Sequence, residues 1–371
     1  MKRYLNIAIA GSRGIPNYYG GFEQLAQFLA DGLVKAGHLV TVYNTHKHPF
    51  KKNEWNGVKI VHCYDAETYL GTAGQFIYDL NCIRHARKMK FDVLLFLGYT
   101  SSSVWGRWYP KKSVIICHMD GLEWKRSKYS IPVQHFLQYA EKLAIKHSHF
   151  FIADSIAIQN YLAEKYTIHS QFIPYGAEIF DDEEEDLLLP YHLTKKKYFM
   201  LMARMEKENN IEMILDGFHN SNADKKFLVV GNTGNRFGRQ LVQKYRKDKR
   251  IQFAGAVYDP HLTHTLKAFC LLYFHGHSVG GTNPSLLEAM ASKALIAAHN
   301  NEFNRAVLGT GGCYFDSSSG VQHLIETIDH GEKEKNMIRL NLEKIKNQYN
   351  WPAVINAYEK FIITCYKQLT Q

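Results

Sequence analysis

The sequence lacks the patterns of several protein classes. No stretch approaches the ~20 uninterrupted apolar residues that a membrane-spanning helix needs. The apolar run near the N-terminus stops at Gly11, too early for a signal peptide, so we expect a buried strand there. The 6 cysteines form no CxxC pair, and neither HxxxH nor HExxH occurs. Metal catalysis therefore has no support, and we expect buried thiols in a reducing compartment.

Size and charge narrow the remaining classes. A chain of 371 residues, 46% hydrophobic, has enough apolar material for two folded domains. The net charge is +10, and residues 1–150 hold the whole excess, with 20 Lys and Arg against 10 Asp and Glu. A basic half predicts an anionic partner, either acidic lipid or nucleic acid, although a merely solvated basic face fits equally well. We expect no nucleic acid, because no known binding module is recognisable.

Short apolar runs alternate with helical patterns, which predicts an α/β protein with parallel sheets. In the first half we expect strands at Leu5–Ala10, Leu39–Tyr43, Val58–His62, Val93–Leu97, Val114–Cys117 and His149–Ala153. In the second half we expect them at Tyr198–Met202, Phe227–Val230, Ile251–Phe253, Leu271–Phe274 and Leu295–Ala298. We predict that the acidic run 180–186 is a solvated linker between the two halves of the chain. We therefore predict a domain at 1–175, completed by a C-terminal helix at 352–371, and a second domain at 190–351.

Glycines follow the first expected strand. Gly11 and Gly14 end it, and Gly20 and Gly21 open the next helix. Glycine lets a backbone approach phosphate closely, and a helix N-terminus attracts anions. The spacing is not GxGxxG and no acidic residue ends the second strand, which disfavours a nicotinamide enzyme. A plain tight turn explains the glycines equally well.

A more specific segment runs from His275 to Met290. It joins an apolar strand to an apolar helix, and Gly280, Gly281, Thr282 and Asn283 stand where that helix begins. These residues suit a diphosphate. Glu288, about one turn into the helix, is placed to accept hydrogen bonds from ribose hydroxyls. The alternative is a capped structural helix whose glutamate is paired elsewhere.

This segment, with its LLEAM ending, resembles the donor site of glycosyltransferase family 4, which has the two-domain GT-B fold. Most members carry E-x7-E, whereas here the first glutamate is replaced by Gly280 and only Glu288 remains. In lacking the first glutamate, the sequence resembles a bacterial rhamnosyltransferase-like subgroup. Members of that subgroup also begin with a GxRGIPxxYGGFE-type segment, as Gly11 to Glu23 do here. Asp120–Arg126 and Arg204 with Glu208-Asn209-Asn210 match as well, so the resemblance covers nearly the whole chain.

The resemblance implies a fold of two Rossmann-like doubly wound domains facing across a cleft. It implies that Arg204 meets the donor diphosphate, with Lys207 or Asn209 as a second contact and the glycines Gly14, Gly20 and Gly21 nearby. No D-x-D motif occurs, so we expect neither metal nor cofactor, and arginine, lysine and helix N-termini would replace a divalent ion. Arg204 in a surface salt bridge is the alternative.

For the acceptor, the segment after the strand Val114–Cys117 is the candidate. Asp120 would orient the attacking hydroxyl and help remove its proton, with His118 as the alternative. Glu123, Lys125 and Arg126 would also bind the acceptor, the two cations meeting its diphosphate. A capping Asp120 in a solvated basic turn is the alternative.

The resemblance thus predicts a retaining glycosyltransferase, with TDP-L-rhamnose as the leading donor and a polyprenyl-diphosphate-linked saccharide of bacterial surface polysaccharide as acceptor. A UDP-hexose donor, a sugar-nucleotide epimerase or a non-catalytic sugar-nucleotide-binding protein remain alternatives. We expect a cytoplasmic protein resting on an anionic membrane. The helix Phe76–Lys90 and the segment 105–112 could form that contact, although an ordinary core helix explains the first equally well.

Overall fold

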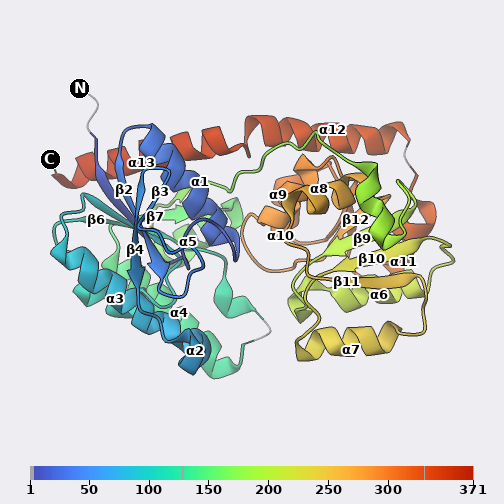
Figure 1. The fold of residues 1–371 in the computed structure, drawn as a ribbon, viewed down its shortest axis with the longest axis horizontal. Coiled ribbons are helices and arrows are strands. Elements are labelled where there is room, and N and C mark those ends of the chain that lie inside the picture. Colours follow the sequence, from blue (N-terminus) through green and yellow to red (C-terminus); the bar gives the residue numbers. More distant parts are fainter. Residues whose placement is uncertain (1–3, 127–128, 330, 371) are drawn as a thin grey trace. The chain divides into compact units, whose positions relative to one another are not determined.

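The computed structural model describes residues 4–126, 129–329 and 331–370. The chain folds into two compact units. The first comprises Met1–Trp124, Ser130–Tyr175 and Trp351–Gln371, and the second comprises Lys125–Tyr129 and Gly176–Asn350. Each unit is a sheet covered by helices (Figure 1). No described helix is both long and apolar enough to cross a membrane.

The sheet of the first unit has the order β3-β4-β2-β1-β5-β6-β7-β8, and every neighbouring pair is parallel except β3 with β4. Its strands are β1 (Asn6–Ala10), β2 (Leu39–Thr45), β3 (Glu54–Trp55), β4 (Val58–Cys63), β5 (Val93–Leu97), β6 (Val114–His118), β7 (Phe150–Ala153) and β8 (Gln171–Phe172). The chain order reverses at β1, and open α/β sheets bind ligands beyond the carboxyl ends of the strands at such a point.

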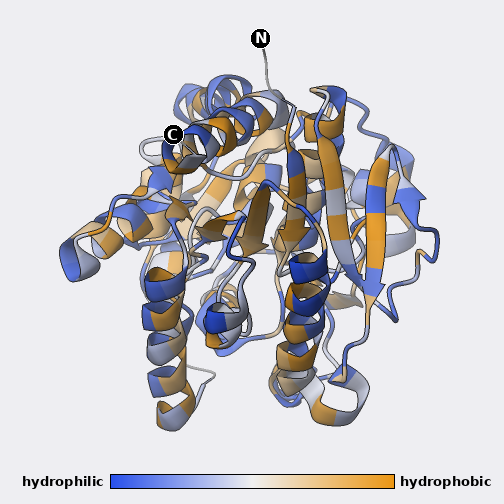
Figure 2. Cartoon of the chain, turned by 90° about the vertical axis from the view of Figure 1, so that its left-hand side faces the viewer, coloured by the Kyte–Doolittle hydropathy of each residue, from blue (hydrophilic) through white to orange (hydrophobic). Residues whose placement is uncertain are grey.

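Burial explains the composition of these strands. The central strand β5 is buried along its whole length, as expected for a parallel strand covered on both faces. Figure 2 shows the central strands of this unit in orange, while the surrounding helices alternate orange and blue. The helices are α1 (Gly21–Lys35), α2 (Glu67–Leu70), α3 (Gly74–Lys88), α4 (Ile131–His147), α5 (Ile156–Tyr166) and α13 (Trp351–Thr370), with short 3-10 turns η1 (Gly71–Ala73), η2 (Ser103–Trp108) and η3 (Glu123–Lys125).

The second unit repeats this plan with a smaller sheet. Its order is β11-β10-β9-β12-β13-β14, all parallel, so the chain order reverses at β9. The strands are β9 (Tyr198–Met202), β10 (Lys226–Val230), β11 (Ile251–Gly255), β12 (Leu272–His275), β13 (Ile296–His299) and β14 (Cys313–Phe315). The helices are α6 (Ile211–His219), α7 (Arg236–Tyr245), α8 (Pro260–Phe269), α9 (Pro284–Ala291), α10 (Glu302–Leu308), α11 (Ser318–Thr327) and α12 (Glu332–Asn347), with turns η4 (Glu185–Tyr191) and η5 (Lys207–Asn209).

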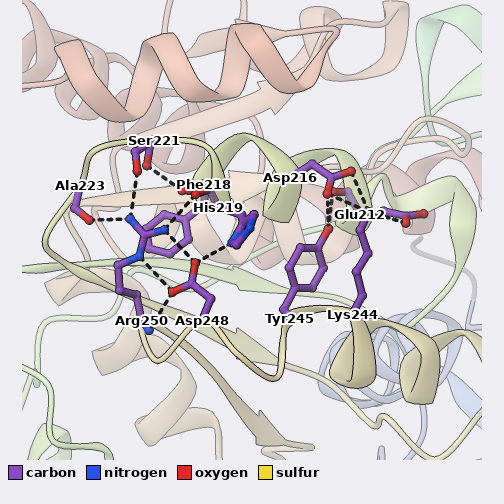
Figure 3. A network of polar contacts seen from close by, with 10 residues as sticks. All are labelled: Glu212, Asp216, Phe218, His219, Ser221, Ala223, Lys244, Tyr245, Asp248 and Arg250. Carbon is purple, nitrogen blue, oxygen red and sulfur yellow. Dashed lines mark hydrogen bonds and ion pairs between the residues drawn. The ribbon is translucent and has the colours of Figure 1, made fainter.

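A polar network joins the elements on one side of the second unit (Figure 3). Arg250 donates to the carbonyls of His219, Ser221 and Ala223 and to the Asp248 carboxylate at 2.7 Å. The bonds to Asp248 from Arg250, and then from His219, hold the pKa of this carboxylate well below its usual range. Lys244 and Tyr245 of α7 contact Glu212 and Asp216 of α6. The network is structural, because its members bond one another and the backbone.

All eleven predicted strands are present, with ends shifted by at most two residues. Three strands were missed, β3, β8 and β14, because two or three residues are too few for a periodic pattern. The linker prediction for 180–186 was incomplete. Lys293 Nζ bonds Asp181 Oδ1 at 2.6 Å and Glu183 Oε1 at 2.8 Å, so part of the acidic run is tied to the second unit.

The helix expected at Phe76–Lys90 is present as α3 (Gly74–Lys88). It buries Cys82, Ile83 and Ala86 in the core of the first unit, whereas Phe76, Ile77 and Leu80 are half-buried. The buried side of α3 packs against protein, and contact of its exposed side with a membrane stays a prediction. The exposed basic residues lie on its other side, where Arg84 and Arg87 approach the ring of Trp108.

Candidate functional site

Two loops meet at the carboxyl edge of the second sheet. Strands β9 and β12 are hydrogen-bonded neighbours, so the loop after β9 (203–209) lies beside the loop after β12 (276–283). Ser278 donates both its N–H and its hydroxyl to the carbonyl of Glu208. The motifs singled out in the sequence around Arg204 and around Gly280 are therefore brought together in one place.

The loop after β12 is fixed by side chains on neighbouring elements. Asn210 donates to the carbonyl of Gly276 at 2.8 Å. Asn301 and Asn304 both donate to the carbonyl of His277, at 2.9 and 3.0 Å. A backbone held in this way loses little further entropy when a ligand binds. The loop is preorganised to present its remaining N–H groups.

Helix α9 begins directly after this loop. Asn283 is its N-cap, with its side chain accepting from the Ser285 N–H at 3.0 Å, and Pro284 occupies the first turn. Gly280 has φ +139°, which only glycine adopts readily, and a Cβ there would meet no atom within 4 Å. Gly281 is half-buried and Thr282 is buried. The four residues thus lie at the helix N-terminus, as the sequence predicted.

Glu288 is held by a buried lysine. Lys267 Nζ, on α8, lies 2.8 Å from Glu288 Oε2. The lysine side chain is 0% exposed, whereas the glutamate is 28% exposed. An unpaired buried lysine would be costly, so this pair is a fixed element with a partly exposed glutamate side chain. This accommodates both sequence interpretations, a paired glutamate and one able to accept a ligand hydroxyl.

The predicted cations differ in their surroundings. Arg204 and Lys207 are exposed. Asn209 is 4% exposed and donates its amide to the carbonyl of Arg204 at 2.8 Å. Its side chain supports the loop, which leaves Lys207 rather than Asn209 with a group able to reach a ligand. Burial, and then the charges of Arg204 and Arg126, lower the pKa of His277 to about 3, so its ring is neutral.

The glycines after β1 have structural reasons of their own. Gly14 has φ +119°, and a Cβ there would lie 2.3 Å from the Asn44 side chain. Asn44 in turn bonds both the N–H and the carbonyl of Ile15. Gly20 is the N-cap of α1, and Gly21 is its first residue. The tight-turn alternative therefore accounts for Gly14 without any ligand.

His118 and Asp120 follow one another at the carboxyl edge of the first sheet. His118 is the last residue of β6 and is 0% exposed, and burial lowers its pKa to about 3. Its Nδ1 accepts the Asp120 N–H at 3.2 Å, so the proton of the neutral ring is on Nε2. Asp120 is half-buried with φ +52°, a conformation that aspartate tolerates better than most residues.

The rest of the predicted acceptor segment divides between the units. Glu123 is half-buried in the first unit, and Lys125 is exposed in the second. Arg126 also belongs to the second unit, where its Nη1 donates to Glu208 Oε1 at 3.2 Å. The Glu208 side chain is only 4% exposed. The Arg126 guanidinium is therefore partly neutralised by protein.

Sequence reasoning missed the residues that support the site. Lys267, Asn301 and Asn304 stand in ordinary helical patterns, and only the fold brings them to Glu288 and His277. Asn301 could have been noticed as a helix N-cap, which it is for α10. Among the side chains that the structure describes, no group of three or more His, Cys, Asp or Glu could hold a metal ion.

Sequence comparison matches the two units to different families. Residues 4–178 match a domain of unknown function, DUF1972. Residues 190–350 match glycosyl transferases group 1. The chain is also 38% identical over 68 residues to an uncharacterized 42.6 kDa protein in the cps region of Klebsiella pneumoniae, a match that spans 18% of each protein.

Solved structures show the same fold over the whole chain. Sucrose-phosphate synthase from Thermosynechococcus elongatus has a TM-score of 0.79 at 15% identity, covering 99% of each chain. HepE from Anabaena, solved with UDP-glucose, has a TM-score of 0.76 at 15% identity, covering 97% of this chain and 100% of that one. The group 1 match places a glycosyltransferase domain at residues 190–350, and the shared architecture shows that the whole chain has the GT-B fold.

Proposed function

We propose that this enzyme transfers a sugar, with retention of configuration, from a nucleotide diphosphate donor to a lipid-linked saccharide. TDP-L-rhamnose is the leading donor, and a polyprenyl-diphosphate-linked saccharide is the acceptor. The observation that carries the proposal is the fixed loop 276–283 running into α9, with the Lys267–Glu288 pair one turn further on.

The second unit would bind the diphosphate and the ribose of the donor. The diphosphate would lie against Gly281 and Thr282 at the start of α9, where the helix dipole favours negative charge. Exposed Arg204 and Lys207 supply positive charge. Glu288 would accept hydrogen bonds from the ribose hydroxyls, while Lys267 keeps the carboxylate in place.

In the chemical step the bond from the sugar C1 to the diphosphate oxygen breaks. The acceptor hydroxyl oxygen bonds to C1 on the same face, and its proton passes to the leaving diphosphate. Arg204 would stabilise the charge that develops on that group. Asp120 would orient the hydroxyl and help remove its proton. His118 suits this role less well, because its Nδ1 already accepts a bond and its pKa of about 3 makes it a weak base.

Two comparisons bear on the substrates. The K. pneumoniae relative is encoded in a cps region, which supports a place in surface-polysaccharide synthesis. HepE was solved with UDP-glucose, which keeps a UDP-hexose donor as the alternative. An epimerase or a non-catalytic sugar-nucleotide-binding protein would use the same donor site.

A donor screen tests the proposal. Thermal unfolding would be followed with TDP-, UDP- and GDP-sugars, since a ligand at 100 times its Kd stabilises the fold by about 2.7 kcal/mol. We expect a shift with one nucleotide class, TDP-rhamnose first, and slow release of free nucleotide without acceptor. Binding with no turnover would favour the non-catalytic protein, and a new sugar without acceptor would favour the epimerase. No shift with any donor would contradict the proposal.

We further propose that the first unit contacts an anionic membrane through an exposed basic surface. Arg84 and Arg87 lie 5.7 and 5.9 Å from the ring of Trp108, which is 43% exposed, and Arg107, Lys111 and Lys112 are exposed beside it. Trp and basic side chains favour the lipid interface. Sedimentation with anionic liposomes should fall steeply as salt rises, and neutral liposomes should bind poorly. Salt-insensitive binding, or tighter binding to DNA, would contradict this.

A further inference from the structure

The first unit contains a cavity that the donor site does not use. It lies at the carboxyl ends of β1, β2 and β4, on the opposite side of β1 from β6 and Asp120. Its volume is about 190 Å³. A cavity of this volume is large enough for one small ring. The loop that follows β1, singled out in the sequence, forms one wall.

The charges in the cavity exclude a phosphate as its preferred ligand. Three carboxylates, Glu23, Asp65 and Glu67, line it with two cations, Arg13 and Lys47. Arg13 is already engaged, because its Nη2 and Nε contact the two oxygens of Glu67 at 2.5 and 3.2 Å. The carboxylates also carry bonds, since Glu23 Oε1 accepts the Arg13 N–H at 2.7 Å and Asp65 Oδ2 lies 2.9 Å from His46 Nδ1. They nevertheless outnumber the cations, and each carboxylate has further lone pairs for hydroxyl donors.

A buried histidine forms part of the wall. His48 is 4% exposed, and its Nδ1 accepts the Phe50 N–H at 3.2 Å. The proton of the neutral ring is therefore on Nε2, an atom with less than 1 Å² of accessible surface. His48 therefore shapes the cavity through its ring, and its buried N–H does not reach a ligand.

Two tyrosines stand exposed at the same cavity. Tyr18 and Tyr19 line it although they are 68% and 60% exposed. The Arg13 guanidinium lies 3.8 Å from the centre of the Tyr19 ring, and the Tyr18 ring meets His48 edge-on at 6.0 Å. Aromatic rings beside hydrogen-bonding groups suit a ligand with an apolar face and a polar rim.

We infer that this cavity binds one uncharged sugar ring of the acceptor saccharide. A pyranose has the required size, an apolar C–H face for a tyrosine and hydroxyl protons for the carboxylates. The inference rests on the proposed function, which it deepens by giving the acceptor a subsite separate from Asp120. It adds Tyr18, Tyr19 and Glu67 to the residues that determine acceptor specificity.

Saturation-transfer NMR tests this with methyl pyranosides of the common hexoses, 6-deoxyhexoses and N-acetylhexosamines. We expect at least one glycoside to bind the full-length protein. Tyr19→Ala and Glu67→Gln should weaken it at least threefold, and inorganic phosphate should not displace it. Tyr258→Ala is the control, because Tyr258 is 82% exposed and belongs to the second unit.

The inference is wrong if no glycoside binds, if both cavity variants bind like the wild type, or if phosphate displaces the sugar. A nucleotide-sugar titration on the same samples separates this failure from failure of the proposed function. If the glycoside results contradict the cavity assignment but the wild type and both variants bind the donor normally, only the cavity assignment is wrong and the donor proposal is unaffected.

Discussion

The carboxyl edges of the two sheets share a topology and differ in chemistry. In each sheet the chain order reverses at the first strand, β1 or β9, and functional loops follow that strand and its neighbours. The second edge exposes Arg204 and Lys207 beside a helix N-terminus. The cavity at the first edge has more carboxylates than cations, and two exposed tyrosines. The fold fixes where ligands bind, and the loop side chains decide which ligands these are.

The same contrast appears in the comparisons. The second unit matches glycosyl transferases group 1, whereas the first matches a domain of unknown function. We therefore expect donor binding to follow the common features of group 1 enzymes. Acceptor choice should depend on the residues of the first unit, so the two edges should respond to mutation in different ways.

The largest effect is expected at the second edge. Arg204→Ala should lower kcat by about 10²–10³-fold, the scale for removing one group that stabilises charge in a transition state. Donor affinity should fall less than kcat/KM, because the charge matters most when the diphosphate leaves. Arg246→Ala, another exposed arginine of this unit, is the control. Equal losses in affinity and in kcat/KM would mean simple binding.

At the first edge, Asp120→Asn should cut transfer by ~10²-fold or more, the scale for losing a positioned acid–base group. Donor affinity should stay unchanged, since Asp120 belongs to the other unit. Steady-state kinetics with donor titration measures both, and Asp31→Asn on α1 is the control. Near-normal transfer would mean that another residue orients and deprotonates the acceptor hydroxyl, with His118 the first residue to test.

A polar group away from both edges should affect stability alone. Asp248→Asn removes charge-assisted bonds to Arg250 and His219 and should cost about 1.5–3 kcal/mol in the free energy of unfolding at pH 7. Because the folded pKa of Asp248 is depressed, this stabilisation is complete above about pH 4 and is lost as the pH falls toward the folded value. Denaturant unfolding should show a difference that shrinks between pH 7 and pH 3. A reduced kcat would contradict the structural assignment.

Periodicity was sufficient for most of the fold. Buried parallel strands such as β5 are apolar throughout, and helix α1 carries its buried residues at helical spacing, so both are visible in the sequence. Strands of two or three residues have no period, and the apolar side of α3 could not be assigned to core or membrane without its neighbours. Local patterns record burial but do not identify what a surface packs against.

The site was predictable where its residues are adjacent in sequence. Gly280 to Asn283 and Glu288 lie in one segment, and the structure keeps them together. Lys267 contacts Glu288 across 21 positions, and Glu208 receives Arg126 across 82. Such contacts depend on the order of the strands, so no sequence motif predicts them. The cavity of the first unit likewise combines three loops that follow three different strands.

The central claim is that the second unit binds a nucleotide diphosphate sugar through Glu288. Calorimetric titration of the wild type, Glu288→Ala and Glu343→Ala with the donor found in the screen tests it directly, since Glu343 is a surface residue paired with Arg339 on α12. Glu288→Ala should bind at least tenfold more weakly, because a charge-assisted hydrogen bond contributes about 1.5–3 kcal/mol. Glu343→Ala should bind like the wild type. Equal affinity for all three proteins would contradict the account.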